Sequence, residues 1–402
     1  MLTMFHANPA LLDDGMFVVD RKCLQGMQRY AQELDVPITA VHARLLPQER
    51  MMDAVRVPVE TLPYRVEVVE TDAVWRLASH ELPRVRRWIA ASTLVYHGSF
   101  NVGPLCAALN VPEALVAEFD VRSTVKSATL EARNPVVKLV RGARALRDHL
   151  ALLPSFRRAW SVHCNGYPVF DELASVNPQR RLLFLDSRMT EDLVIDEARL
   201  EQRLAARPSQ RLRLLYSGRY EAMKGALDVV RLGLACIDRG MDIELHLYGQ
   251  GRQADAMRQL AAAADDRIRV HGAVPYPELV AISRDFDVFV CCHVQNDPSC
   301  TYLESFGSGL PIVGYANRMW RGLRRASSVG MQGPLGRIEP LVDALQRYLD
   351  EPDRLARDAR AARRFALEHS FEREFAKRIA DLRRMLAQAE RKSQAQAQAQ
   401  AA

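Results

Sequence analysis

Three loops in the second half of the chain combine glycines with groups that bind anions. The first is Ser217-Gly218-Arg219-Tyr220-Glu221-Ala222-Met223-Lys224-Gly225, in which glycines allow tight turns and Arg219 and Lys224 supply two cations. A helix is expected to begin at Gly225, and the free N–H groups at a helix start attract anions. A diphosphate suits this arrangement. A turn with two solvated cations explains the first loop, taken alone, equally well.

The second loop is Tyr248-Gly249-Gln250-Gly251, and it follows an apolar segment that predicts a strand. Short Gly-x-Gly signals of this kind are common, so this loop by itself predicts only a tight turn from strand to helix. Its position between the first and third loops is what adds information.

The third loop leads into a helix within residues 296–313. Pro298 and Ser299 favour a helix start there, with Ser299 as the N-cap. The backbone N–H groups of the next residues would then point at a phosphate. These residues are Cys300, Thr301 and Tyr302. Glu304 follows, and its carboxylate can accept hydrogen bonds from a ribose diol, whereas the simpler interpretation is that it complements the helix dipole.

The elements around these loops predict where the loops meet. In residues 212–314, apolar segments of strand length alternate with helical segments, and each loop follows the end of an apolar segment. A less regular alternation fills residues 1–187. Both halves therefore predict an α/β fold with two Rossmann-like, doubly wound parallel-sheet domains. Ligands of such sheets bind at the carboxyl ends of the strands, so the three loops should share one edge.

Changes in composition divide the chain into units. Residues 188–210 are polar and rich in arginine, which favours a linker, and the pattern after residue 339 is almost wholly helical. The C-terminal SQAQAQAQAQAA has low complexity and is expected to be disordered or weakly helical. The expected units are a first domain (1–187), a linker (188–210), a second domain (211–370), a final helix (371–389) and a tail (390–402).

Composition bears on the class and the location of the protein. The 402 residues carry a formal net charge of +6, which favours anionic partners. Seven scattered cysteines lack zinc-type or C-x-x-C spacing, so reduced thiols are expected. The sequence shows neither a secretory signal nor a long apolar segment, so a cytoplasmic protein is expected.

Asp285-Phe286-Asp287 is similar to a D-x-D metal motif. This segment precedes its strand, whereas a ligand site should lie at the end of a strand, and no metal is expected.

The order of the three loops resembles the donor half of GT-B glycosyltransferases, and of glycosyltransferase family 4 in particular. The similarity extends over about residues 212–367, and residues 371–389 are similar to the helix that returns to the first domain in that fold. The resemblance implies a retaining transfer of a hexose from a nucleoside-diphosphate sugar, without a metal or other cofactor. The acceptor would bind the first domain, across a cleft from the donor.

The resemblance also implies roles for individual residues. Arg219 and Lys224 would stabilise the leaving diphosphate as charge develops, which is an electrostatic form of catalysis. Glu304 would bind the ribose. The implied donor-binding residues are Gly218, Arg219, Lys224, Gly249, Ser299, Cys300, Thr301 and Glu304.

The chain departs from the family pattern at three places. Asn296 stands where the family has a first glutamate that touches the sugar, so either Asp297 takes that catalytic role or the contact is built differently. Asp120 stands where the family has a histidine that faces the sugar, and His97, at the end of another strand, is the alternative. Asp13-Asp14-Gly15 is the nearest substitute for the family's glycine pair after the first strand.

A basic amphipathic helix is expected at residues 136–150. Its cations recur every three residues, at Lys138, Arg141, Arg144 and Arg147. Such a helix can lie on an anionic membrane, although a solvated surface helix is the simpler interpretation. With the family resemblance, this face favours a lipid-linked glycan or a growing polysaccharide as acceptor, and a peripheral position on the inner face of the membrane.

Two other functions remain open at this point. A GT-B epimerase or hydrolase would convert the donor without an acceptor, and a non-catalytic partner protein would only bind a nucleotide sugar. Asn296, in place of the expected glutamate, keeps the second alternative open. Nucleic acid is not expected as a partner, because the basic residues lack interleaved aromatic residues and no reader motif occurs.

Overall fold

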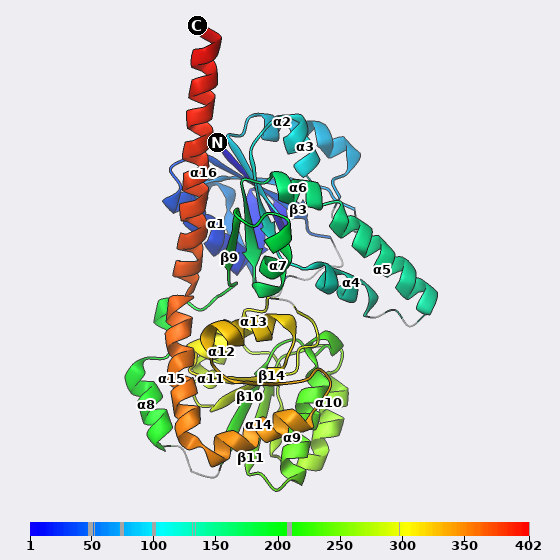
Figure 1. Ribbon diagram of the computed structural model, residues 1–402, viewed down its shortest axis with the longest axis vertical. Helices are drawn as coiled ribbons and strands as arrows, with labels where there is room; N and C mark the ends of the chain where they lie inside the picture. The colour runs from blue at the N-terminus through cyan, green and yellow to red at the C-terminus, as the bar shows by residue number, and fades with distance from the viewer. Residues whose placement is uncertain are drawn as a thin grey trace.

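The protein has two lobes, each built around one β-sheet, and its last two helices run one along each lobe (Figure 1). The computed structural model describes residues 1–46, 51, 53–72, 76–98, 102–130, 132, 134–206, 211–296 and 298–401. Two Rossmann-like domains and a helix that returns to the first of them confirm the expected fold class.

Among the described residues, nine strands form the sheet of the N-terminal domain. They are β1 (Leu2–Asp13), β2 (Met16–Asp20), β3 (Ile38–Arg44), β4 (Ala54–Pro58), β5 (Arg65–Val69), β6 (Leu94–His97), β7 (Glu113–Ala117), β8 (Ser161–Asn165) and β9 (Arg181–Phe184). The parallel part has the order β5-β3-β1-β6-β7-β8-β9. This order places the apolar β1, β6 and β7 at its centre, where both faces are covered.

The far end of β1 leaves the parallel sheet and forms an antiparallel hairpin with β2, which also pairs with β4. Asp14 and Gly15 have φ angles of 46° and 70°, as a two-residue hairpin turn requires. Asp13-Asp14-Gly15, considered above as a substitute for a glycine-rich ligand loop, is therefore the tip of this hairpin. The local Asp-Gly turn signal explains the difference, because it closes a hairpin directly.

Helices cover both faces of the N-terminal sheet (Figure 1). They are α1 (Arg21–Glu33), α2 (Leu82–Ala90), α3 (Gly103–Ala108), α4 (Val121–Thr129), α5 (Pro135–Leu150), α6 (Leu153–Arg158) and α7 (Tyr167–Glu172). Met27 and Tyr30 of α1 join one apolar core with Met4 of β1, whereas Val85 and Ile89 of α2 join another on the opposite face.

Within the described residues, the C-terminal sheet has six parallel strands in the order β12-β11-β10-β13-β14-β15. The strands are β10 (Leu212–Ser217), β11 (Ile243–Tyr248), β12 (Ile268–Val270), β13 (Val288–Cys291), β14 (Ile312–Tyr315) and β15 (Met331–Gly333). Strand order reverses between β10 and β13. The carboxyl ends of strands at such a switch point form the usual ligand crevice of an open α/β sheet.

The remaining helices pack around the C-terminal sheet and connect it to the first domain. They are α8 (Glu197–Ala206), α9 (Ala226–Asp238), α10 (Ala254–Ala261), α11 (Tyr276–Ser283), α12 (Thr301–Gly307), α13 (Arg318–Ser327), α14 (Glu339–Asp350), α15 (Pro352–Glu368) and α16 (Phe371–Ala401). The arginine-rich segment expected as a linker thus contains α8. Among the described helices, none is both long and apolar enough to cross a bilayer.

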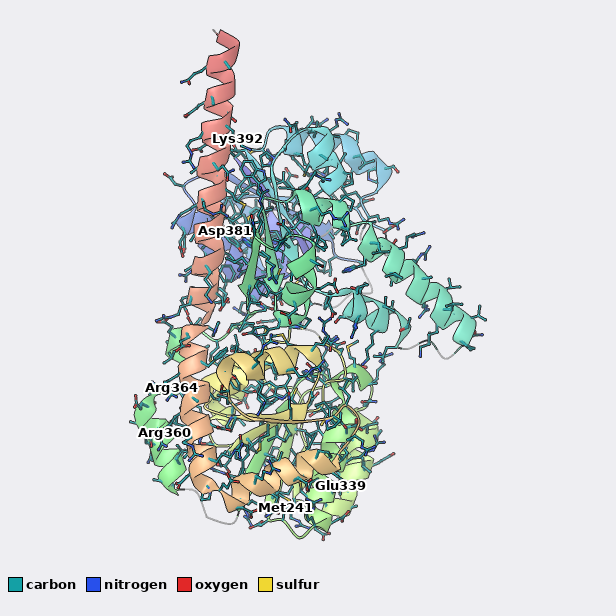
Figure 2. All side chains as sticks on the ribbon, in the orientation of Figure 1. Met241, Glu339, Arg360, Arg364, Asp381 and Lys392 are labelled. Atoms are coloured by element: carbon teal, nitrogen blue, oxygen red, sulfur yellow. The ribbon has the colours of Figure 1, made fainter. Side chains whose placement is uncertain are left out.

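Helix α16 returns to the N-terminal domain along α1. Phe375 fits against α1 at Gly26, where a Cβ atom would lie 2.7 Å from the phenyl ring. Asp381 and Lys392, labelled in Figure 2, contact β8 and the residue before it: Asp381 accepts a 3.0 Å hydrogen bond from His163, and the Lys392 ammonium lies 4.6 Å from the ring centre of Trp160.

The helix continues through the low-complexity tail to Ala401, where disorder or weak helicity was expected. Alanine and glutamine both have high helix propensity, and the tail extends a helix that tertiary contacts have already nucleated.

A buried histidine in the N-terminal domain predicts a loss of stability in acid. His42 of β3 is fully buried, its ring stacks on His6 with centres 5.0 Å apart, and its Nδ1 donates to the Asn8 carbonyl at 3.0 Å. Burial lowers the pKa of His42 to about 4. Its neutral form is therefore favoured by folding, and this stability is present above pH 6.5 and lost as the pH falls from about 6.5 to about 4.

We expect the His42→Phe variant to lose part of the pH dependence of the unfolding free energy, on the order of 3 kcal/mol between pH 7 and pH 4. Chemical denaturation at a series of pH values measures this. His80→Gln is the control, because the His80 side chain is 64% exposed. A difference between wild type and His42→Phe that is the same at every pH contradicts the assignment.

Candidate functional site

The first two glycine-containing loops pack backbone against backbone at the carboxyl ends of β10 and β11. The Gly218 N–H donates to the Tyr248 carbonyl at 3.0 Å. Gly249 has a φ of 157°, and a Cβ atom there would lie 1.9 Å from the Gly218 carbonyl oxygen. Glycine at position 249 is therefore required for the two loops to touch.

A second close approach joins the first loop to the segment after β13. Gly225 has a φ of 60°, and a Cβ atom there would lie 1.9 Å from the carbonyl oxygen of Cys292. The Val294 N–H donates to the Met223 carbonyl at 3.1 Å. The loops after β10, β11 and β13 therefore meet at one edge of the sheet, at the switch point.

The two cations of the first loop lie at this edge. Arg219 is exposed, whereas Lys224 is 5% exposed and lies at the end of a 3-10 turn, Ala222–Lys224, directly before Gly225 and α9. The Tyr220 hydroxyl fastens the loop: its oxygen lies 2.7 Å from the Leu247 carbonyl oxygen and 2.8 Å from that of His271, and its one proton is shared between them. The loop therefore has a rigid base, with the exposed Arg219 at its surface.

The helix after the third loop, α12, begins later than predicted. Its N-cap position is Cys300, and no side chain caps it. The prediction that Ser299 is the N-cap is therefore wrong, because the Ser299 hydroxyl turns to the Thr301 hydroxyl at 3.0 Å. At the other end of α12, the buried Arg203 donates to the carbonyls of Ser308 (2.9 Å) and Gly309 (2.7 Å), which satisfies the helix end.

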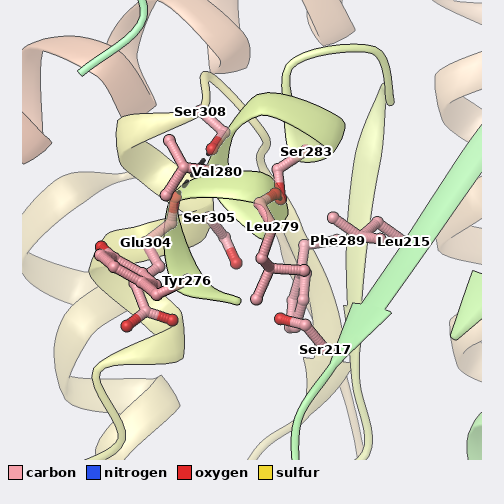
Figure 3. Close-up of a pocket in the computed structure, with 10 residues that line it drawn as sticks. All are labelled: Leu215, Ser217, Tyr276, Leu279, Val280, Ser283, Phe289, Glu304, Ser305 and Ser308. Atoms are coloured by element: carbon pink, nitrogen blue, oxygen red, sulfur yellow. Dashed lines mark hydrogen bonds between the residues drawn. The ribbon is translucent and has the colours of Figure 1, made fainter. Parts of the chain in front are cut away.

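Glu304 of α12 lines a small cavity with Ser217 and Tyr276 (Figure 3). The cavity has a volume of ≈ 10 Å³, close to the smallest space that holds one water molecule. Ser217 ends β10, so Glu304 lies beside the same strand end as Arg219. The structure thus brings the carboxylate and the first loop to one site.

Arg188, which the sequence did not predict as a site residue, holds the Glu304 carboxylate. Its Nε and Nη2 lie 2.9 Å and 2.8 Å from Oε1 of Glu304, and its guanidinium lies 4.2 Å from the ring centre of Tyr276. Burial acts to lower the pKa of Arg188, but the neighbouring carboxylate of Glu304 raises this pKa by more than burial lowers it. The guanidinium is therefore charged. Both bonds end on Oε1, and they fix the direction of the carboxylate.

Two of the departures from the family pattern converge on one residue, Arg318 at the start of α13. Its backbone N–H donates to Oδ1 of Asn296 at 2.9 Å, and its guanidinium donates to Oδ2 of Asp120. Asp120 is fully buried and caps α4, with Oδ1 accepting the Ser123 N–H at 2.8 Å. Asp120 and Arg318 thus join the two domains. Asp297 lies outside the described residues.

A second cluster crosses between the domains at the start of α12. Lys22 of α1 donates to Asp186 and lies 3.1 Å from the Cys300 sulfur, which is itself 3.3 Å from Asp186. Burial, reinforced by Asp186, raises the pKa of Cys300 to about 12, so the thiol is protonated and donates to the carboxylate. Lys22 and Asp186 were not predicted from sequence.

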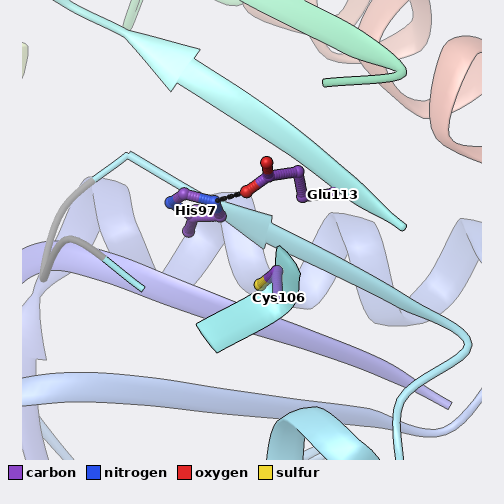
Figure 4. A group of neighbouring side chains, drawn as sticks. All are labelled: His97, Cys106 and Glu113. Atoms are coloured by element: carbon purple, nitrogen blue, oxygen red, sulfur yellow. Dashed lines mark hydrogen bonds and ion pairs between the residues drawn. The ribbon is translucent and has the colours of Figure 1, made fainter. Parts of the chain in front are cut away.

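His97 lies inside the N-terminal domain (Figure 4), bonded through Nε2 to Glu113 at 2.9 Å. With Cys106 these residues form a group of three potential metal ligands in the described part of the chain. Arg158 already donates to Glu113 at 2.7 Å, and burial raises the pKa of Cys106 to about 12. A guanidinium and a neutral thiol fit a metal poorly.

The D-x-D-like segment is held by ion pairs. Asp285 pairs with Arg199 at 2.8 Å, and Asp287 accepts from the backbone and side chain of Arg213 at the start of β10. Both carboxylates therefore stabilise the amino end of the sheet, away from the carboxyl ends where the loops meet.

Comparison with known proteins identifies the family. Residues 211–351 match the family described as "Glycosyl transferases group 1". This match lies within the C-terminal domain, and the chain is a glycosyltransferase with the GT-B fold. This glycosyltransferase is 26% identical over 279 residues to a phosphatidyl-myo-inositol mannosyltransferase of Mycobacterium leprae, a match that covers 66% of this chain and 67% of the relative.

Solved structures share the fold of the glycosyltransferase over nearly its whole length. Sucrose-phosphate synthase of Thermosynechococcus elongatus has a TM-score of 0.63 at 14% identity, with 96% of this chain and 99% of that chain covered. Alr3699/HepE of Anabaena, in complex with UDP, has a TM-score of 0.63 at 12% identity, with coverage of 98% and 100%. At sequence identities this low, the similarity to these structures shows a shared fold only.

The contact between Gly225 and Cys292 predicts the stability of a variant. In Gly225→Ala the new Cβ would press on a backbone carbonyl that cannot move aside, so we expect a loss of about 2–4 kcal/mol in unfolding free energy. Gly240→Ala is the matched control: Gly240 has a φ of 82° with no atom within 4 Å of the added Cβ, so only the left-handed backbone costs about 1–2 kcal/mol. Equal losses in chemical denaturation contradict the proposed contact.

Proposed function

We propose that this glycosyltransferase transfers a hexose from a nucleoside-diphosphate sugar, with retention of configuration, to a glycan or lipid-linked glycan. The donor binds at the carboxyl ends of β10, β11 and β13. The observation that carries the proposal is the convergence of Arg219, Lys224 and Glu304, from one loop and one helix, at the switch point of the sheet. Relatives support it, because HepE is known in complexes with UDP and UDP-glucose.

The diphosphate lies, in this proposal, between the first loop and the start of α12. Gly218 and Gly249 allow the backbone to approach it closely, and Arg219 and Lys224 offset its charge. The N–H groups of Cys300 and Thr301 bind its oxygens, with Ser299 beside them. The same cations stabilise the diphosphate as it leaves, which is where charge develops. With this positive charge supplied by the chain itself, the proposed reaction needs no metal and no other cofactor.

Glu304 binds the ribose hydroxyls. Because Arg188 donates two hydrogen bonds to Oε1, the carboxylate has a fixed orientation. A carboxylate held in this way accepts hydrogen bonds from a diol without the cost of ordering a free side chain. Arg188 is therefore a positioning residue for the donor.

Asp120 and Asp297 are the acidic residues proposed for the sugar side of the site. Asp120 acts through Arg318, since its carboxylate binds that guanidinium and fixes the start of α13 against the N-terminal domain. Asp297 follows Asn296, whose side chain is bonded to Arg318. Arg318 therefore joins the acceptor side of the cleft to the donor side.

The acceptor binds the N-terminal domain, and closure of the two lobes excludes water, which would otherwise compete as acceptor. The mannosyltransferase relative, whose name specifies phosphatidyl-myo-inositol, supports a lipid-linked acceptor. We accordingly propose a role in polysaccharide or glycolipid biosynthesis, in the cytoplasm or at the inner membrane surface.

Donor binding tests the proposal directly. We expect nucleoside diphosphates to raise the melting temperature, because a ligand that binds only the folded state stabilises it. Lys224→Ala should weaken binding at least tenfold, since it removes a charge-assisted contact with the diphosphate. Glu304→Ala should weaken the binding of the nucleoside diphosphate but not the binding of inorganic pyrophosphate, which has no ribose. Lys392→Ala, on α16, is the control. Unchanged binding in Lys224→Ala contradicts the diphosphate assignment.

Product analysis separates transfer from the alternatives. With donor and acceptor present, we expect a glycosylated acceptor whose anomeric configuration equals that of the donor, which proton NMR resolves early in the reaction. With donor alone, an epimerised sugar or rapid hydrolysis would identify a different GT-B enzyme. An inverted anomeric configuration would contradict the proposed stereochemistry and leave the donor site standing.

A further inference from the structure

Helix α5 leaves most of its apolar side chains in solvent. Among the described residues, nine large hydrophobic side chains are exposed, and six of them lie on this one helix. They are Val136 (67% exposed), Val137 (40%), Leu139 (73%), Val140 (61%), Leu146 (42%) and Leu150 (48%). Contiguous apolar surface of this kind on a protein marks an interaction site.

The exposed apolar residues form one stripe. At 3.6 residues per turn, Val136, Leu139, Val140, Leu146 and Leu150 fall within an arc of about 120°. The face of α5 that packs on α4 is a different one, because Gly142 lies against Thr129 and Val125 of α4. The stripe is therefore not the buried side of a helical hairpin. It faces away from the protein.

Basic side chains share the exposed surface of this helix. Lys138, Arg141, Arg144 and Arg147 are exposed, and the acid of the helix, Asp148, is already paired with Arg147 at 2.8 Å and with Arg76 at 3.3 Å. By the same rotation Arg147 lies within the arc of the stripe and Arg144 lies about 40° beyond its edge, whereas Lys138 and Arg141 lie farther round the helix. An apolar stripe on a helix that also carries several cations matches the two layers of a bilayer surface, which are acyl chains and anionic headgroups.

Contacts at both ends hold α5 in place, although its apolar stripe is exposed to solvent. Asn134 caps its start by accepting the Val136 N–H at 2.8 Å, and the buried His149 bonds to Glu172 at 2.8 Å near its end. Figure 1 shows α5 projecting sideways from the N-terminal domain, beside the level at which the two lobes meet. A preformed helix in this position binds a surface without the entropic cost of folding.

We infer that α5 docks the enzyme on an anionic lipid bilayer, with the stripe in the headgroup region and the cations of the helix on acidic headgroups. This inference rests on the proposed function for the position at a membrane surface and deepens it by naming the helix that makes the contact. Helix α4 lies between this surface and the cleft: Asp120 caps it, and Lys126 donates to the Val294 carbonyl in the donor domain. Docking would therefore bring the cleft to the membrane, where a lipid-linked acceptor resides.

Co-sedimentation of the full chain with phosphatidylcholine vesicles, with and without phosphatidylglycerol, tests the inference. We expect binding to the mixed vesicles, none to the neutral ones, and weakening as salt is raised. Both Lys138→Glu/Arg141→Glu/Arg144→Glu and Leu139→Gln/Val140→Gln/Leu146→Gln should weaken binding at least tenfold. Arg337→Glu/Arg357→Glu/Arg364→Glu makes the same charge change at exposed positions of the C-terminal domain and should keep near wild-type binding.

Each result decides for or against the inference. Failure of the wild type to bind anionic vesicles overturns it, as does full binding by both α5 variants. An equal loss in the C-terminal control means that net charge alone, and not α5, governs binding, which also overturns it. Nucleoside-diphosphate affinity measured on the same variants should be unchanged, which shows that they are folded and separates this test from that of the donor site.

Discussion

The carboxyl ends of the central strands of the C-terminal sheet approach each other so closely that only glycine fits between their loops. A Cβ atom at Gly249 or Gly225 would lie 1.9 Å from a carbonyl oxygen of the neighbouring loop, and one at Gly314 would lie 2.2 Å from that of Cys291. This backbone packing is what gathers Arg219, Lys224 and the start of α12 at one place. With larger residues the loops would separate, and the charges proposed to bind the diphosphate would separate with them.

Contacts between the domains form a second level of organisation. Arg318 joins Asp120 to Asn296, and Lys22 joins Asp186 to Cys300, so each domain contributes charged groups to the other at the cleft. These partners are buried or partly buried, and removing one of them would leave a charge without compensation. The lobes are therefore held in a defined relation, in which the donor loops face the N-terminal domain.

Local patterns predicted the fold and the meeting of the three loops at one edge of the sheet, because strands, turns and glycine-rich loops are determined by nearby residues. The apolar segments predicted as strands within residues 212–314 include β10, β11 and β13. Arg188, Lys22 and Arg318 could not be found in this way, because each acts on residues 22 to 278 positions distant, through pairings that only the tertiary fold creates. The apolar stripe of α5 was visible in sequence, but only the structure shows that it remains uncovered.

The central claim is that one diphosphate is bound jointly by the first loop and the start of α12, with the ribose on Glu304. A crystal structure of the complex with a nucleoside diphosphate tests this most directly. We predict phosphate oxygens within about 3 Å of Arg219 and Lys224. The ribose hydroxyls should donate to the Glu304 carboxylate, while Arg188 remains hydrogen-bonded to Oε1 of Glu304. A diphosphate bound elsewhere on the protein, or at this edge without contact to Lys224 and Glu304, would contradict the account.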